Sequence, residues 1–449
     1  MSTITGETTL SLEVTREAET IKTIPALAKH IEELSGGTTA DLLRIIFGGA
    51  VALNASDLHV EPGEEQVKVR LRVDGILHDV ISLAPKSYRT LLSRVKLLAG
   101  MKLNISDRPQ DGRFSVVMAH GTRDGSDTAA ETAAEKIPET RIEIRVSAIP
   151  AERGEAMVAR ILNPKNLIHL DELGLREDLL AVFREEIKKP NGMIIVTGPT
   201  GSGKTTTLYA FLKTIQNPEI KIITIEDPIE YHLEGVEQTQ ISKNYGFANG
   251  LKSIVRQDPD VILVGEIRDG ETCDIALQAA LTGHLVFTTI HTNDAAGTIA
   301  RLIALDAKPY NIGPAINIAV AQRLVRKLCQ GCSEPLPISG AELKIFQQEL
   351  KDLPKQMKIP EIKSGIKLPR ATGCEICNGT GYKGRIGIFE CFPVDSEMET
   401  FILKLPSIAE LRDLAIKKGM VTMRQDGLIK ALRGVTNVKE VERVTAEKA

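Results

Sequence analysis

One segment of the chain has the residue types that hold phosphate groups. "GPTGSGKT", residues 198 to 205, satisfies the spacing G-x-x-x-x-G-K-[ST], follows the apolar run "MIIVT" and precedes the helical "TTTLYAFLKTI". In such a loop backbone N–H groups surround the phosphates, the lysine reaches the β and γ phosphates, and the threonine ligates Mg²⁺. The residues expected to bind the nucleotide are Gly198, Pro199, Thr200, Gly201, Ser202, Gly203, Lys204, Thr205 and Thr206. Thr205 is also a predicted magnesium ligand.

Three later stretches place acids or histidines beside apolar runs: "TIEDPIEYH", "VILVGEIRD" and "TGHLVFTTIHT". Nucleotide hydrolysis needs a group that orients water and a second hold on Mg²⁺. Each group alone has an ordinary structural explanation, as a solvated loop acid, a helix cap or a hydrogen-bonded core histidine. Together they favour a hydrolytic site, because the carboxyl ends of parallel strands converge on one crevice. The candidates are Glu226, Asp227, Glu230, Glu266, His284 and His291.

The strand-like run "VILV" ends in Gly265 and Glu266, where a nucleotide-hydrolysing enzyme usually has an Asp that holds magnesium. Either the chain is no such enzyme or its carboxylates are arranged differently.

Four of the six cysteines form two C-x-x-C pairs, Cys329 with Cys332 and Cys374 with Cys377. Each pair can occupy one edge of a tetrahedron, so the four thiolates suit a structural Zn²⁺ site. A redox dithiol needs only one such pair. The other two cysteines, Cys273 and Cys391, have no partner at metal-binding spacing and are expected to be buried small residues.

The patterns that must position these groups predict a multidomain α/β protein. Between about residues 190 and 290, continuous apolar runs alternate with helical segments, which is typical of a parallel sheet covered on both faces. An earlier region alternates apolar and polar residues, as in "QVKVRLRV", and predicts a small α+β domain. The expected regions are a flexible arm (1–36), the α+β domain (37–163) with a loop at 120–139, a hinge (164–176), the ATPase core (177–328), the cysteine element (329–388) and a helical C-terminal region (389–449).

Composition excludes several other classes. Lys and Arg (56) nearly balance Asp and Glu (59), so no global basic field indicates nucleic acid or anionic lipid as the main partner. No run of 18 apolar residues and no secretory leader pattern is present, which predicts a cytoplasmic protein.

The order of "GPTGSGKT", "EDPIEY", "VGEIRD" and "TGHLVFTTIHT" resembles the Walker A, Asp box, Walker B and His box of the secretion ATPase superfamily, which powers type II secretion systems and type IV pili. The resemblance extends to "ASDLHVEP", "DRPQDGRFS" and the cysteines, over about residues 40 to 435. It implies a RecA-like P-loop core that hydrolyses ATP, with a PAS-like α+β domain before it. It also implies that Glu230 is the general base, that Glu266 coordinates Mg²⁺ through water, and that His291 senses the γ-phosphate.

The same resemblance gives roles to the preceding domain and to the assembly. It implies that Arg113, Arg145 and Arg160 are directed at the nucleotide, so that hydrolysis rotates one domain against the other. It implies a homohexameric motor at the cytoplasmic face of the inner membrane, docked on platform proteins that assemble pilins or pseudopilins. The four cysteines resemble the tetracysteine motif of secretion and pilus-assembly ATPases, generally missing from pilus-retraction ATPases.

Two other functions remain open at this point. A nucleic-acid translocase also has a RecA-like sheet, but the chain has no Trp and no basic tract interleaved with aromatic residues. A nucleotide-gated adaptor would bind ATP and hardly hydrolyse it. The choice between type II secretion and type IV pilus assembly is open as well.

Overall fold

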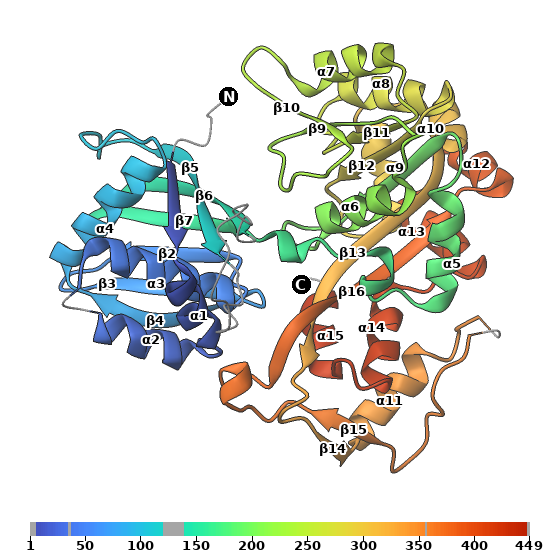
Figure 1. Ribbon diagram of the computed structural model, residues 1–449. Helices are drawn as coiled ribbons and strands as arrows, with labels where there is room; N and C mark the ends of the chain where they lie inside the picture. The colour runs from blue at the N-terminus through green and yellow to red at the C-terminus, as the bar shows by residue number, and fades with distance from the viewer. Residues whose placement is uncertain (1–5, 35–36, 120–138, 355–356, 447–449) are drawn as a thin grey trace, which may run out of the picture. The chain divides into compact units, whose positions relative to one another are not determined.

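The computed structural model describes residues 6–34, 37–119, 139–354 and 357–446. The chain divides into two compact units, one comprising Met1–Asn166 with Gly373–Thr380 and the other Leu167–Thr372 with Gly381–Ala449 (Figure 1). The loop expected at 120 to 139 falls, except for its last residue, outside the described residues. None of the helices in the described part of the chain is long and apolar enough to cross a membrane.

The first unit is built on a seven-stranded sheet with the order β1-β5-β6-β7-β2-β3-β4. Neighbouring strands are antiparallel, except that β1 runs parallel to β5. The strands are β1 (Gly6–Leu10), β2 (Asp57–Pro62), β3 (Val67–Val73), β4 (Ile76–Leu83), β5 (Gln110–Ala119), β6 (Glu139–Ala151) and β7 (Gly154–Leu162). The helices are α1 (Leu12–Thr20), α2 (Ile24–Glu33), α3 (Thr39–Ala52) and α4 (Pro85–Leu98).

Alternation along these strands separates a buried apolar face from a polar face. In β3, Val67, Val69 and Leu71 are buried, whereas Lys68 and Arg70 point to the other side. The apolar face and the helices share one hydrophobic core. The opposite face of the sheet therefore remains available for charged side chains.

The expectation of a flexible arm over residues 1 to 36 is wrong for the described residues 6–34. Leu10, Ile21, Leu27 and Ile31 are essentially inaccessible and belong to the core of the first unit. Composition concealed this packing because the segment is polar on average, while the buried residues of α2, Ile24, Leu27 and Ile31, fall on one stripe of the helix. Short amphipathic helices of this kind gain most of their stability from tertiary contact.

The second unit contains a seven-stranded sheet with the order β10-β9-β11-β12-β8-β13-β16. All its neighbours are parallel except β16, which is antiparallel to β13. The strands are β8 (Gly192–Thr197), β9 (Ile222–Glu226), β10 (Glu237–Gln240), β11 (Val261–Val264), β12 (Leu285–Ile290), β13 (Ile316–Leu328) and β16 (Tyr382–Pro393). The helices up to β13 are α5 (Glu177–Glu186), α6 (Lys204–Ile215), α7 (Phe247–Ile254), α8 (Gly270–Leu281), α9 (Ala295–Ala304) and α10 (Pro309–Ala315).

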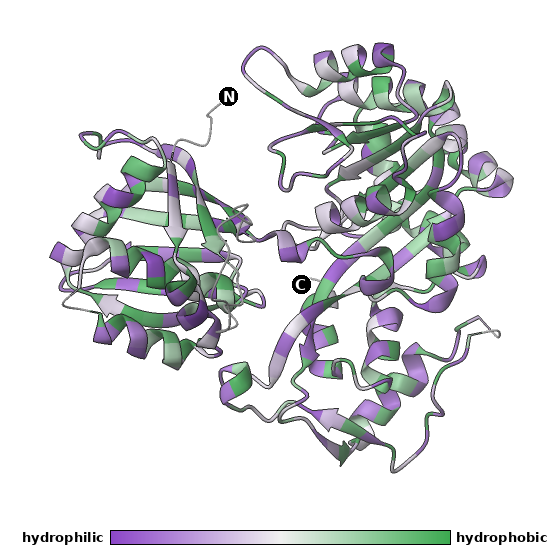
Figure 2. Ribbon diagram, viewed as in Figure 1, coloured by the Kyte–Doolittle hydropathy of each residue, from purple (hydrophilic) through white to green (hydrophobic). Residues whose placement is uncertain are grey.

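The parallel strands of this sheet are apolar because both faces are covered. Every residue of β8, β9, β11 and β12 is buried. Two hydrophobic cores share these strands, one containing α7, α8 and α9 and the other α5 and α6. Figure 2 shows hydrophobic residues along the central strands of this sheet, whereas the helices that cover it alternate between hydrophilic and hydrophobic residues. The predicted α/β class is thus confirmed.

The C-terminal part of the second unit begins with a strand, not with a helix. Residues 389 to 393 belong to β16 and the first helix begins at Ser396, so the expectation that the helical region starts at 389 is wrong by seven residues. The helices that follow are α12 (Ser396–Ile402), α13 (Ile408–Lys417), α14 (Met423–Leu432) and α15 (Val438–Thr445). The cysteine region contains β14 (Glu334–Pro337), α11 (Gly340–Glu349) and β15 (Lys367–Arg370).

A buried charge cluster joins the expected hinge segment to this helical region. Nη1 of Arg176, just before α5, forms an ion pair with Oδ1 of Asp426 of α14 at 2.9 Å. The other carboxylate oxygen of Asp426 accepts from Lys430 at 2.5 Å and from the backbone N–H of Phe389 at 2.8 Å. All three charged side chains are buried. Leu170, Leu173 and Arg176 are thus buried in the second unit.

Candidate nucleotide-binding site

The loop between β8 and α6 has the backbone geometry that phosphate binding requires. Gly198, Gly201 and Gly203 have φ values of 146°, 77° and 90°, which other residues rarely adopt. A Cβ on Gly198 would lie 2.4 Å from the carbonyl oxygen of Gln322, and one on Gly203 would lie 2.8 Å from its Nε2. Gln322 of β13 also accepts from the hydroxyl of Thr207 at 2.7 Å. The loop is therefore packed closely against the neighbouring strand.

Lys204 opens helix α6 and turns back into the loop. Its Nζ donates to the carbonyl oxygens of Gly198 at 2.8 Å and Pro199 at 3.2 Å. Burial lowers the pKa of Lys204, and the nearby carboxylate of Glu266 acts in the opposite direction. Thr205 lies half-buried in the first turn of α6, beside this lysine. A cation and a helix N-terminus thus face the same place.

The ends of β11 and β12 bring a carboxylate and a histidine together. The side chain of Glu266, just beyond β11, is 14% exposed, and its Oε2 lies 3.3 Å from Nε2 of His291, just beyond β12. The hydroxyl of Thr289 donates to the carbonyl of Gly265 at 2.7 Å and so ties the two strand ends. His284 precedes β12 and lies at the opposite end of that strand.

Arg268 is a site residue to which the sequence reasoning assigned no role. Its guanidinium contacts the carboxylate of Glu266 and donates to Asp227 at 3.3 Å. Its position in "VGEIRD", two residues after Glu266, is the sequence feature that could have identified it. It connects the end of β11 with the loop that follows β9.

The two glutamates of "EDPIE" have different environments. Glu226, the last residue of β9, is buried and accepts hydrogen bonds from Tyr209, from Thr224 at 2.6 Å and from Gln238 at 3.2 Å. Burial raises its pKa, and the nearby charge of Glu230 adds to the effect. Glu230 lies in the loop after the strand and is half-buried. Water can reach Glu230, whereas the carboxylate of Glu226 is enclosed by its donors.

The sheet order places these groups along one edge. The strands lie in the order β9-β11-β12-β8, and all four are parallel. Their carboxyl ends therefore lie next to one another, and these ends carry Glu226, Glu266, His291 and the phosphate loop. Carboxylate and hydroxyl oxygens such as those of Glu266 and Thr205 are the donors that Mg²⁺ prefers. The residues present fit a nucleotide with its magnesium.

The three candidate arginines of the first unit lie side by side on the polar face of its sheet. Arg113 of β5 is opposite Arg145 of β6, which is opposite Arg160 of β7, and Arg160 is opposite Asp57 of β2. The row continues to Arg72 of β3. Sequence reasoning found three members, and only the strand register shows that they form one row.

Two acidic residues form ion pairs with the arginines of this row. The carboxylate of Glu143 lies 3.0 Å from Nε of Arg145 and 3.9 Å from Arg113, and Asp57 lies 3.2 Å from Nε of Arg160. The two carboxylates offset the electrostatic repulsion between neighbouring arginines and orient their side chains.

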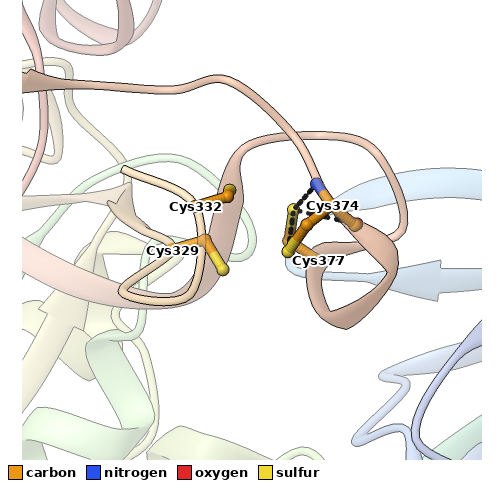
Figure 3. A group of neighbouring side chains, drawn as sticks. All are labelled: Cys329, Cys332, Cys374 and Cys377. Carbon is orange, nitrogen blue, oxygen red and sulfur yellow. Dashed lines mark hydrogen bonds between the residues drawn. The ribbon is translucent and has the colours of Figure 1, made fainter. Parts of the chain in front are cut away.

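The four predicted metal-binding cysteines come together (Figure 3). The Sγ atoms of Cys329, Cys332, Cys374 and Cys377 all lie within 4.8 Å of one another, and those of Cys374 and Cys377 are 3.8 Å apart. A tetrahedral Zn²⁺ with Zn–S bonds of ~2.3 Å requires S···S distances of about 3.8 Å. The cluster therefore fits zinc.

The two remaining cysteines are separate from this cluster. Cys273 is buried and Cys391 is partly buried, and burial raises the pKa of each thiol to about 12. They are packing residues.

A doubly covered parallel sheet with a phosphate loop, an adjacent Glu–His pair and acids at one edge defines a RecA-like P-loop ATPase. The chain matches the family model "Type II/IV secretion system protein" over residues 32–124 and 130–443 and belongs to that family.

Curated relatives include proteins of two machines. Type II secretion system protein E of Xanthomonas campestris is 42% identical over 411 residues, which cover 90% of this chain and 67% of that protein. The type IV pilus assembly ATPase PilB of Myxococcus xanthus is 38% identical over 447 residues, covering 99% of this chain and 73% of that protein.

Solved structures are similar as well. The pilus retraction motor PilT with bound ADP has a TM-score of 0.57 and 25% identity, covering 90% of this chain and 97% of that one. The ATPase DotB of Yersinia pseudotuberculosis, at 20% identity and a TM-score of 0.64 over 91% of this chain and 94% of that one, shares the fold.

Proposed function

We propose that this protein is the ATP-hydrolysing motor of a type II secretion or type IV pilus assembly machine. The observation that carries the proposal is the meeting of the phosphate loop, the Glu266–His291 pair and the loop of Glu230 at one edge of the sheet. Relatives named type II secretion protein E and PilB support the choice of machine. Hydrolysis would rotate one domain against the other within a homohexameric ring and so drive the assembly of pilins or pseudopilins.

Each site residue has a part in the proposed reaction. Lys204 and the loop amides bind the β and γ phosphates, and Glu230 accepts a proton from the attacking water. His291, held by Glu266, contacts the γ-phosphate. Thr205 would hold Mg²⁺ directly and Glu266 through water, and the ion would neutralise charge developing on the phosphate oxygens.

The arginine row of the first unit has a separate proposed role in the reaction. Arginines that neutralise charge in the transition state of phosphoryl transfer are worth on the order of 10³-fold in rate. We assign this role to Arg113, Arg145 and Arg160. Support comes from their alignment on one polar face and from the carboxylates that orient them.

The cysteine cluster and the cellular setting complete the proposal. Zn²⁺ held by the four thiolates would stabilise the 329–388 segment. The motor would bind platform proteins at the cytoplasmic face of the inner membrane, with no nucleic acid involved.

The test is steady-state ATP hydrolysis by the Glu230→Gln variant. General base catalysis contributes about 10²- to 10⁴-fold, so turnover should fall by at least about 100-fold while ATP binding persists. Glu234→Gln, at an exposed position of the same loop, is the matched control and should keep wild-type turnover.

Unchanged turnover in Glu230→Gln would favour the nucleotide-gated adaptor. Stimulation of the wild-type ATPase by single-stranded DNA would favour the nucleic-acid translocase.

A further inference from the structure

Tyr209 is a buried side chain on the phosphate-loop helix α6 that reaches the end of β9. Its hydroxyl donates to the carboxylate of Glu226. The two other donors to that carboxylate, Thr224 and Gln238, are also neutral. A carboxylate taken out of water in this way is costly unless its hydrogen bonds are well made, so the cluster is expected to be rigid.

The same cluster continues into the loop that carries Glu230. The side chain of Gln238 donates to the carbonyl of Tyr231 at 3.0 Å and accepts from the N–H of Leu233 at 2.8 Å. The ring of Tyr231 packs edge-on against that of Tyr209, with 6.3 Å between the centroids. Burial raises the pKa of the Tyr209 hydroxyl, and the backbone groups of Tyr231 and Glu230 oppose that rise.

One helix therefore has two attachments. Its first turn contains Lys204, which contacts the phosphate loop, and its second turn contains Tyr209, which contacts the Glu230 loop. The separation between the phosphates and the base is consequently set through α6, not only through the sheet. General base catalysis depends on that separation, because the base must reach the water that attacks the γ-phosphate.

We propose that Tyr209 and Glu226 are positioning residues that hold Glu230 in register with the phosphate loop. This inference rests on the proposed role of Glu230 as the base. Tyr209 is fully buried and therefore acts through the loop that carries Glu230.

The test begins with Tyr209→Phe, which removes the hydroxyl and keeps the ring. Misplacement of a catalytic group by about 1 Å can cost on the order of 100-fold, so kcat should fall between about 10- and 100-fold. The KM for ATP should change less than about 2-fold, because Lys204 and the loop are untouched. Tyr245→Phe is the matched control, since its hydroxyl donates to Thr239 at 3.3 Å in the same unit, and it should keep wild-type kcat.

A double-mutant cycle separates positioning from simple stability. If Tyr209 acts through Glu230, adding Tyr209→Phe to Glu230→Gln should leave the residual turnover unchanged. A full additional loss in the double variant, or a loss in the single variant explained by unfolding at the assay temperature, would overturn the inference. If Glu230→Gln alone kept full turnover, the proposed base would be wrong whatever Tyr209→Phe did. If Glu230→Gln lost turnover and Tyr209→Phe kept it, only the positioning role would be wrong.

Discussion

Replacing Asp426 with Asn should destabilise the second unit strongly. Asp426 is 0% exposed and is the counter-charge for Arg176 and Lys430, whose side chains are only 7% and 6% exposed. Asn preserves the shape and removes the charge, so two buried cations lose their partner. Breaking a buried ion pair in this way costs about 3–5 kcal/mol.

Asp178→Asn is the control, because Asp178 binds the same guanidinium at 3.1 and 3.2 Å but is 54% exposed. A pair with one exposed partner contributes about 1 kcal/mol or less. The assay is urea unfolding of the full chain, followed by far-UV circular dichroism and by binding of a fluorescent ATP analogue, which reports on the second unit. A loss below about 1 kcal/mol in Asp426→Asn, or an equal loss in Asp178→Asn, would refute the reasoning.

The pH dependence provides a second measurement on the same cluster. Burial raises the pKa of Asp426, but Lys430 and Arg176 outweigh burial and hold the pKa below its usual range. Its contribution to stability is therefore present above the unfolded pKa of ~3.9 and is lost as the pH falls through the folded value. Burial lowers the pKa of Lys430, and Asp426 opposes that shift. In Asp426→Asn the lysine should lose its proton more readily, so the deficit should be smaller at pH 9 than at pH 6.

Three further variants test other parts of the molecule. Glu266→Gln should raise the Mg²⁺ concentration needed for half-maximal hydrolysis by about 10-fold or more, because a residue that holds a metal through water typically contributes about 10- to 100-fold in affinity. Nucleotide binding without metal should be unchanged. An unchanged Mg²⁺ titration would remove Glu266 from the metal site. Cys377→Ser should reduce the bound zinc, measured by mass spectrometry of the metal, from about one per chain to near zero while ATP binding persists; equal zinc in both proteins would contradict the tetrathiolate site. Leu27→Ala should cost the first unit about 2–5 kcal/mol in urea unfolding, because the side chain is fully buried; a negligible change would restore the idea of a detached arm.

Much of the second unit could be predicted from sequence because its signals are local. The phosphate loop is defined by eight consecutive residues, and the flanking strand and helix show their own periodicity. Parallel order then follows from alternating apolar runs and helices, and it brings the carboxyl ends together. The role of Glu266, at a position where an Asp is usual, could also be predicted from sequence, because "VGEIRD" is one of four motifs in a fixed order.

The first and last boundaries were harder to predict because they depend on partners distant in sequence. Residues 6 to 33 contain too few apolar side chains to indicate a core by themselves, and their burial depends on the sheet and helices that follow. The run at 389 to 393 is a strand because it pairs with β13, about 70 residues earlier, as Phe389 with Gln322.

The sequence by itself determined the fold class, the phosphate loop, the candidate acids and the two cysteine pairs, because each rests on residue types at short spacing. Only the tertiary structure decided how these groups combine. It separated buried Glu226 from accessible Glu230, paired Glu266 with His291, aligned the arginines in one row and gathered the four thiols. These are distances between segments separated by tens of residues, and they are set by strand order, register and side-chain packing, which no local pattern encodes.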